Sequence, residues 1–371
     1  MRENWTYKKI GDLCNIKTGK LDANAANKNG KYPFFTCSKE PMSINTYAYD
    51  CECVLIAGNG DLNVKYYNGK FNAYQRTYIL NLKEEIDDIT IPYIYDFFLL
   101  YVDELRRKSI GGIIKYIKLG DLANAKIPVP PLSEQHAIVS ELDKINELIS
   151  LKKAQLSDLD ALAQSIFYDM FGDPIENEKG WEVKKLEEMC SCITKGTTPT
   201  TLGFSFTEKG INFVKVESFI DGHIDHSKLA HITYECNMAL LRSQLRDEDL
   251  LICIAGATIG KMAVVDTSIL PANTNQACAI VRLKDKNNLR FLHAFIALKL
   301  KEYVIQMGKG VAQPNLSLGQ LRKLIIFCPP LSLQQDFAKR VELIEQQKAQ
   351  ISSTIKDLET LLASRMQYWF D

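Results

Sequence analysis

The chain has 371 residues, 46% of them hydrophobic and 24% charged, and its 45 basic and 45 acidic side chains give a formal net charge of zero. This length supports two ordinary domains with their own cores, and no apolar run approaches the roughly 18 residues of a membrane-spanning helix. An N-terminus without an apolar signal segment and ten cysteines without framework spacing argue against an exported disulfide scaffold and predict a cytoplasmic protein without membrane contact.

The first part of the chain, residues 1–131, is predicted to be a body of mixed strand and helix. It begins near Trp5 and soon enters a polar, basic loop with a glycine at residues 17–20. Short apolar runs that end in turns indicate buried strands, and a longer stretch is typical of a helix. These segments are, in order, 54–58, 74–80, the helix-like stretch 91–108, a glycine turn at 110–113 and a strand-like run into Pro130-Pro131.

A long helix-like run over residues 132–173 follows these prolines. Its apolar side chains are spaced alternately four and three apart, which is the a/d pattern of a coiled-coil helix interrupted by one lysine. We expect Ser133 to cap this helix and the prolines to stop the strand before it. The positions of the seam are Ile138, Leu142, Ile145, Ile149, Lys152, Leu156, Leu159, Ala163, Ile166 and Met170.

The second part, residues 174–330, repeats the first in the same order. It crosses a polar linker to Trp181 and again enters a basic loop with a glycine, at residues 194–199. The bodies are therefore predicted to be diverged copies of one domain type. The matching segments are 251–256, 275–281, the helix-like stretch 289–307, a glycine turn at 308–311 and a strand-like run into Pro329-Pro330.

A second helix, residues 331–371, completes the repeat, because residues 127–170 align without a gap at a constant offset of 199. Ser332 and Gln335 fit a capping box at its start. Neither seam can be buried alone, so we expect the helices to pack as an antiparallel coiled coil, each on the order of 55 Å long. The C-terminal helix should then finish beside the first body, in a pseudo-twofold cyclic arrangement. The second seam consists of Phe337, Val341, Ile344, Lys348, Ile351, Ile355, Leu358, Leu362, Arg365 and Trp369. Lys152 and Lys348, which interrupt the seams, either fix the register between the helices or reach out to solvent.

The zero net charge conceals a segregation of charge along the chain. Residues 1–131 carry 18 basic against 15 acidic side chains, and residues 174–330 carry 19 against 16. The two helical runs are acidic, with 3 against 8 in residues 132–173 and 5 against 6 in residues 331–371. The mildly basic bodies are suited to contact the phosphates of a nucleic acid, whereas the acidic helical runs would remain available to bind other proteins.

This organisation resembles the specificity subunit of Type I restriction-modification systems. The resemblance rests on the Pro-Pro-Leu-Ser motifs at 130–133 and 329–332, on the ungapped repeat, and on the tryptophan, Trp5 or Trp181, near the start of each body. It covers essentially the whole chain. It implies an α+β fold in which two target recognition domains, 1–131 and 174–330, are joined and spaced by two conserved helices, 132–173 and 331–371.

The resemblance also implies a function and a set of partners. The chain would bind a bipartite, asymmetric site in double-stranded DNA, with one half-site for each domain and a gap set by the helices. Two methyltransferase subunits, which carry S-adenosylmethionine, and restriction subunits, which use ATP and magnesium, would dock on it, and the chain itself would hold no cofactor. The second passage departs from the first in having Leu333 in place of Glu134, so contacts with partners need not be equivalent.

Candidate DNA contacts are the polar side chains on the loops of the two bodies. Base edges are read by hydrogen bonds from Arg, Lys, Asn and Gln, whereas phosphate contacts fix the register. Each residue alone also fits a solvated loop, so the prediction concerns the set, with the Lys17 and Lys195 loops foremost. The candidates in the first body are Lys17, Thr18, Lys20, Asn59, Lys65, Tyr74, Gln75, Arg76, Lys115 and Tyr116. Those in the second are Lys195, Thr197, Thr198, Lys215, Thr258, Lys261, Asn275, Gln276, Lys309, Gln313 and Asn315.

The sequence gives weaker support to enzymatic functions. Residues 256–262 imitate a phosphate-binding loop but lack the Ser/Thr that would hold magnesium. Neither Pro-Pro pair follows the Asn or Asp of an amino-methyltransferase motif. His223, Asp225, His226 and His231 lie in one copy only, where exposed loop histidines explain them better than a metal site. We therefore predict no catalytic and no metal-binding residues, and keep two alternatives: a stand-alone nuclease or methyltransferase with an unrecognised site, and a scaffold whose bodies bind proteins.

Overall fold

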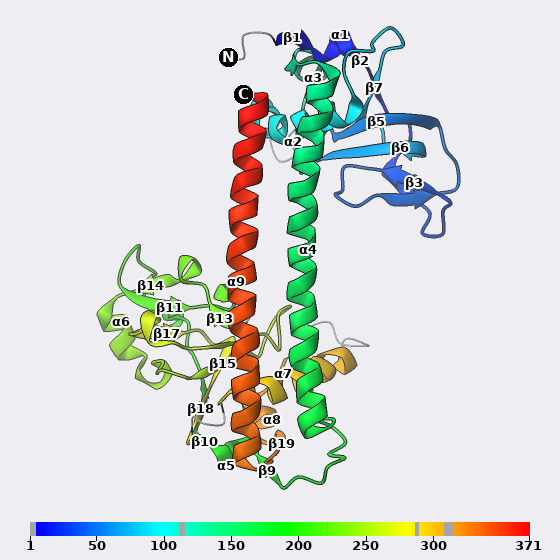
Figure 1. The fold of residues 1–371 in the computed structure, drawn as a ribbon. Helices are drawn as coiled ribbons and strands as arrows, with labels where there is room; N and C mark the ends of the chain where they lie inside the picture. The colour runs from blue at the N-terminus through cyan, green and yellow to red at the C-terminus, as the bar shows by residue number, and fades with distance from the viewer. Residues whose placement is uncertain (1–4, 111–115, 221, 286–288, 308–314) are drawn as a thin grey trace. The chain divides into compact units, whose positions relative to one another are not determined.

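A computed structural model describes residues 5–110, 116–220, 222–285, 289–307 and 315–371 (Figure 1). The chain forms two compact units, one from Met1–Gln155 with Ile351–Asp371 and the other from Leu156–Gln350. Both long helices therefore contribute to both units. Within the described residues, no helix is long and apolar enough to cross a bilayer.

The first unit is built on a six-stranded sheet of order β2-β7-β5-β6-β3-β4. Its neighbours are antiparallel except for β3 and β6, which are parallel. Alternation along β5 sends Val54 and Ile56 into the core against α2, and Cys53 and Leu55 into a smaller cluster on the other face. The strands are β2 (Cys14–Thr18), β3 (Tyr32–Phe35), β4 (Met42–Ile44), β5 (Tyr49–Ala57), β6 (Val64–Ala73) and β7 (Thr77–Leu82), and a separate pair joins β1 (Thr6–Lys9) to β8 (Lys126–Val129).

Helix α2 (Ile91–Lys108) covers one face of this sheet and matches the predicted bounds. Thr90 caps it by accepting a hydrogen bond from the backbone amide of Tyr93, Pro92 lies in the first turn, and basic residues fill the last turn. The apolar stripe of α2 includes Phe97 and Phe98, both nearly inaccessible to solvent. The shorter helices of the unit are α1 (Ile10–Leu13), α3 (Leu119–Ala123) and the 3-10 turn η1 (Ala23–Ala25).

The second unit repeats this plan, with the order β10-β18-β15-β16 in place of β2-β7-β5-β6. The single strand β6 of the first unit corresponds to two strands, β16 and β17. Phe34 faces Asn72 across a parallel pair in the first unit, as Phe213 faces Asn273 in the second, which fixes the correspondence. The strands are β9 (Val183–Lys185), β10 (Cys190–Lys195), β11 (Ile211–Val214), β12 (Phe219–Ile220), β13 (His223–Ile224), β14 (Ala230–Ile232), β15 (Leu250–Cys253), β16 (Met262–Val264), β17 (Ala272–Thr274), β18 (Cys278–Leu283) and β19 (Ile325–Phe327).

Helix α7 (Leu289–Met307) is the counterpart of α2 and also has the predicted bounds. Its Phe291 and Phe295 are buried where α2 buries Tyr93 and Phe97, at a constant offset of 198. The other helical segments are α5 (Leu186–Met189), α6 (Tyr234–Ala239), α8 (Leu318–Arg322), and the 3-10 turns η2 (Pro199–Leu202), η3 (Val216–Ser218), η4 (His226–Lys228), η5 (Leu241–Ser243) and η6 (Thr267–Ile269).

The two long helices, α4 (Leu132–Phe171) and α9 (Leu331–Phe370), have 40 residues each. All predicted seam positions are buried or half-buried, whereas their neighbours are mostly exposed. In the first unit Arg365 donates to Glu141 at 2.9 Å, and Lys153 pairs with Glu359 at 3.0 Å, so the helices run antiparallel there. In the second unit Phe167 packs on Phe337 and Lys348 pairs with Asp160 in the same sense. The predicted antiparallel pairing is confirmed within each unit.

The two lysines that interrupt the seams behave differently. Lys348 forms its ion pair across the helix pair, with Asp160 of α4, and so contributes to the register. Lys152 instead donates to Gln155 of its own helix at 3.0 Å.

The predicted serine caps of α4 and α9 are wrong. Each helix begins at the leucine before its serine, Leu132 or Leu331, and the carbonyl groups of Pro131 and Pro330 accept its first hydrogen bonds. The glutamine two residues after each serine fixes how the chain enters the helix, because Gln135 donates to Pro130 O and Gln334 donates to Pro329 O, both at 2.8 Å. A backbone cap leaves no sequence signal that distinguishes it from a serine cap two positions later.

The C-terminal end of α9 completes the core of the first unit, as predicted. Phe370 is buried against Tyr93 and Phe97, and Trp369 stacks on Trp5 with ring centroids 6.2 Å apart. In Figure 1 the red end of α9 lies beside the start of α4 and beside α2. Trp5 also donates to Glu134 at 3.0 Å, which gives Glu134 an internal role that Leu333, packed on the core of the second unit, cannot have.

Candidate nucleic-acid interface

Each unit gathers polar residues where the turn after its first sheet strand crosses the backbone of a neighbouring strand. In the first unit the amide of Gly19 donates to Thr77 O at 3.1 Å, and in the second the amide of Gly196 donates to Cys278 O at 3.2 Å. A Cβ atom on either glycine would collide with a carbonyl oxygen, that of Ala73 or Thr274. Only glycine permits so close an approach of the two backbones, and both units have a glycine at this crossing.

In the first unit the crossing borders a pocket of about 590 Å³. Four predicted residues line it: Thr18 from the end of β2, Gln75 and Arg76 from the turn between β6 and β7, and Tyr116 from the segment before α3. Asn59 pairs with Tyr116 as an isolated bridge beside the pocket. Residues that are far apart in the sequence therefore form one polar concavity, which also includes Gly58, Tyr78, Ile117, Lys118 and Leu119.

In the second unit hydrogen bonds hold the corresponding turn together. The Gln276 side chain accepts from the amide of Thr198 at 3.1 Å, and from its hydroxyl group. Arg242, next to α6, donates to the Thr197 hydroxyl at 3.3 Å. Lys195 is exposed at the end of β10, opposite Ala279, which is the register position that Thr18 has opposite Tyr78 in the first unit.

The remaining candidates of the first unit lie around the pocket or away from it. Lys17 lies on the opposite face of β2 from Thr18, because alternate side chains of a strand point to opposite faces. Lys20 is exposed, and Tyr74 is half-buried and bridges Leu21. Lys65 is half-buried on β6, hydrogen-bonded to Asn63, and its burial lowers its pKa. Lys115 lies outside the described residues.

The remaining candidates of the second unit are also dispersed. Lys215 lies over the ring of Phe206 at 4.0 Å, and the Thr258 hydroxyl lies 3.5 Å from the Cys253 sulfur in the turn after β15. Lys261 is exposed, the Asn275 side chain accepts from the amide of Ala277 at 3.1 Å, and Asn315 bridges Ala255 as Tyr116 bridges Asn59. Lys309 and Gln313 lie outside the described residues.

Sequence reasoning missed Arg242, Lys118 and the two glycines. Arg242 lies in a segment between β10 and β15 that is longer than its counterpart in the first unit, so the repeat offered no partner for comparison. Gly19 and Gly196 did carry a signal, since both follow the first sheet strand, but the crossing that requires them is a tertiary feature.

These surfaces offer both hydrogen-bond donors and acceptors. Gln, Asn, Arg and Thr offer donors and acceptors suited to base edges, and lysines suit phosphates. Burial raises the pKa of the Cys14, Cys190 and Cys278 thiols to about 12, so these thiols stay neutral and unreactive near pH 7. Among the described residues no three His, Cys, Asp or Glu side chains form a group that could hold a metal ion.

Comparison with known proteins supports the same reading. The family model described as "Type I restriction modification DNA specificity domain" matches residues 2–161 and 178–360. The chain is 39% identical over 158 residues to the Type I restriction enzyme EcoDI specificity subunit of Escherichia coli, covering 42% of this chain and 34% of that protein. It is 22% identical over 318 residues to the EcoBI specificity subunit of Escherichia coli, covering 78% and 66%. The chain thus spans less than two thirds of the length of either relative.

The fold has solved counterparts as well. A crystal structure of the Type I restriction-modification S subunit from M. genitalium matches with a TM-score of 0.58 at 17% identity, over 99% of this chain and 96% of that one. That identity supports the fold alone. With the family model matched over most of its length and with this duplicated α+β architecture, the chain belongs to the family of Type I restriction-modification DNA specificity proteins.

Proposed function

We propose that this chain is the sequence-specificity subunit of a Type I restriction-modification system. Each recognition domain, residues 1–131 and residues 174–330, reads one half of a bipartite, asymmetric site in double-stranded DNA. The observation that carries the proposal is the duplicated surface: the same glycine crossing presents different side chains, such as Arg76 in one unit where the other has Ala277. Two domains of the same fold whose loops carry different side chains suit two different half-sites.

The helices α4 and α9 set the gap between the half-sites. A continuous helix of 40 residues is about 60 Å long, at about 1.5 Å per residue. A coiled coil of that length is stiff, so changes in its length translate into spacing along DNA, much as dimer geometry sets half-site spacing in other DNA-binding proteins.

Catalysis is assigned to partners. Two methyltransferase subunits with S-adenosylmethionine, and restriction subunits with ATP and magnesium, dock on the chain in the cytoplasm, and the chain supplies DNA recognition and assembly. The alternative of a stand-alone enzyme is not favoured, because the relatives are named specificity subunits. The possibility that both bodies bind proteins is likewise not favoured, since the family is described by DNA specificity.

The test compares the purified chain alone with the chain mixed with its cognate methyltransferase subunit. Site-specific adenine methylation is expected only in the mixture. Methylation or cleavage of DNA by the chain alone would refute the proposal, as would a mixture that methylates without sequence preference.

A further inference from the structure

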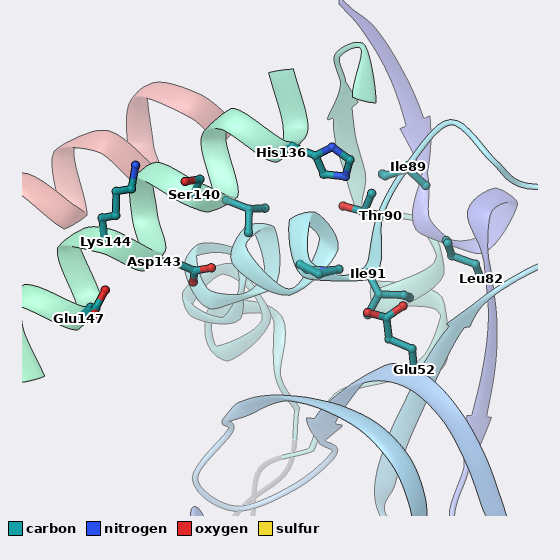
Figure 2. A pocket seen from close by; sticks show the side chains of 12 residues that line it. Glu52, Leu82, Ile89, Thr90, Ile91, His136, Ser140, Asp143, Lys144 and Glu147 are labelled. Carbon is teal, nitrogen blue, oxygen red and sulfur yellow. The ribbon is translucent and has the colours of Figure 1, made fainter. Parts of the chain in front are cut away.

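A second pocket of about 550 Å³ lies in the first unit, away from the polar concavity (Figure 2). One wall is a face of α4, which contributes Val139, Asp143 and Glu147, and another is the start of α2 with the loop before it. Ile89 and Ile91 give this second wall an apolar character, and Glu52 closes the pocket from β5. The pocket is therefore apolar on one side and acidic at its edge.

Three carboxylates, those of Glu52, Asp143 and Glu147, line this pocket. Glu52 is oriented by the Tyr66 hydroxyl, which donates to it at 2.7 Å. Asp143 and Glu147 lie one helical turn apart on the same face of α4. The basic lining residues are His136 and Lys144, and in Figure 2 the Lys144 side chain points away from Asp143 and Glu52.

A fourth carboxylate lies behind this acidic edge. Asp96 of α2 is only 3% exposed, and its Oδ2 atom has no hydrogen-bond partner in the described part of the chain. Burial, and after it the nearby charge of Asp143, raise its pKa to about 8. Carboxylates therefore outnumber the two basic residues, His136 and Lys144, at this corner of the first unit.

The second unit shows what fills the corresponding place. Position 290 corresponds to Pro92, which lines the pocket, at the offset of 198 between α7 and α2. There the guanidinium group of Arg290 pairs with Glu345 of α9. Glu345 corresponds to Asn146, which lies between Asp143 and Glu147 on α4, at the offset of 199 between the long helices.

The second unit also places a further segment of its own chain beside this position. Gly222, beside β13, lies close to the ring of His293, whose position corresponds to Tyr95. His293 interacts electrostatically with Glu345, His223 and Arg290, so these four side chains form one cluster. One copy of the domain thus holds an arginine of its own, partly exposed, against its long helix, whereas the other has an open pocket.

We propose that the pocket of the first unit receives an arginine side chain from a partner protein, in the place that Arg290 has in the second unit. A guanidinium group is planar and pairs with carboxylates through two parallel hydrogen bonds, and its stem packs well on apolar walls such as Ile89 and Ile91. The identity of the partner, a docked methyltransferase subunit, rests on the proposed function, but recognition of the guanidinium group does not.

The consequence is that two identical partner subunits dock differently on the two units. The subunit on the first unit inserts an arginine, and the subunit on the second meets a surface already closed by Arg290 and the β12–β13 hairpin. The pocket therefore makes the two halves of the chain non-interchangeable as docking platforms.

The first test needs no partner. The chain with labelled Ile and Val methyl groups is titrated with N-acetyl-L-arginine amide, with N-acetyl-L-lysine amide as the matched probe. Methyl signals of Ile89, Ile91 and Val139 should shift with arginine amide, more than with lysine amide, while Ile344 of the second unit stays unchanged. The double variant D143N/E147Q should lose the shifts. Unchanged pocket signals in the wild type, or equal shifts with both probes, would overturn the proposal.

The second test uses the complex. The double variant P92R/N146E transfers the ion pair of the second unit into the first, and calorimetric titration with the methyltransferase subunit should show one of two docking events weakened at least ten-fold. D143N/E147Q should weaken the same event, and DNA binding by both variants should be unchanged. Glu342→Gln, at the position that corresponds to Asp143, is the control and should leave both events intact.

The two tests separate the ideas they examine. If both docking events keep their affinity in both variants, the pocket does not receive the partner and the inference is wrong. If the wild-type chain binds no methyltransferase at all, the proposed assembly fails, and the arginine-amide titration still decides whether the pocket recognises a guanidinium group.

Discussion

The buried Asp96 makes the stability of the first unit depend on pH, and replacing it should remove that dependence. The carboxyl group is 3% exposed and one of its oxygens has no hydrogen-bond partner among the described residues. Burial, reinforced by the charge of Asp143, raises its pKa from 3.8 to about 8. The folded unit therefore keeps a proton on Asp96 that the unfolded chain releases between these two values.

The sign and size of the effect follow from proton linkage. Because the folded state binds the extra proton, the free energy of unfolding falls as pH rises from about 4 to about 8. At about 1.36 kcal/mol per pH unit, the loss is at most on the order of 5 kcal/mol, and relaxation around the charge reduces it. Asp96→Asn has no charge to lose, so the free energy of unfolding of this variant should be nearly flat over the same range.

Tryptophan fluorescence can report on the first unit alone. Of the three tryptophans, Trp5 and Trp369 belong to the first unit and Trp181 to the second. In a Trp181→Phe background, urea unfolding at pH 5 and at pH 8 gives the stability of the first unit. The advantage of Asp96→Asn over aspartate should grow by a few kcal/mol between the two pH values. Asp143→Asn, which removes only the neighbouring charge, should flatten the dependence slightly. Equal pH dependence in Asp96→Asn and the parent would refute the reasoning.

Three further predictions concern the readers and their spacer. In a mobility-shift assay, Gly19→Ala should disrupt DNA binding by the first domain, because a Cβ atom at residue 19 would collide with the Ala73 carbonyl oxygen. The control is Gly120→Ala, where a Cβ atom would meet only the end of the Asn124 side chain. This control should bind DNA normally. Arg242→Ala should lower the affinity for cognate DNA by about ten-fold, because a lost base or phosphate contact costs about 1–3 kcal/mol of binding free energy. Arg246→Ala is the control, and equal affinities of the two variants for DNA would contradict the role assigned to Arg242. Inserting one heptad into α4 between Ile138 and Ile166, with a matching heptad in α9, should change the gap between unchanged half-sites in the methylated sequence. Altered half-sites at the old gap would count against a spacer role for the helices.

The fold was largely predictable because its determinants are local and repeated. The seam from Ile138 to Met170, read at intervals of three and four, located α4 and α9 and their packing, since a coiled-coil stripe must be buried along its whole length. The ends of α2 and α7 were also predictable, because apolar stripes ended there at polar or glycine-rich turns.

The site was less predictable because it depends on register and on tertiary crossings. Lys17 and Thr18 looked equivalent in the sequence, but a shift of one residue in a strand reverses the face, and only Thr18 lines the pocket. Arg242 reaches Thr197 from a segment that is longer in the second unit than in the first. Nothing in the sequence singled out Asp96, and only the packing of α2 shows that it is buried.

The most direct test of the account is an exchange of residues 174–330 for those of another member of the family, followed by the methylome of cells that express the hybrid with its methyltransferase subunit. The account predicts a bipartite methylated sequence in which one half-site and the gap are retained and the other half-site is new. A change in both half-sites, or a methylated sequence without a fixed gap, would contradict independent readers separated by a helical spacer.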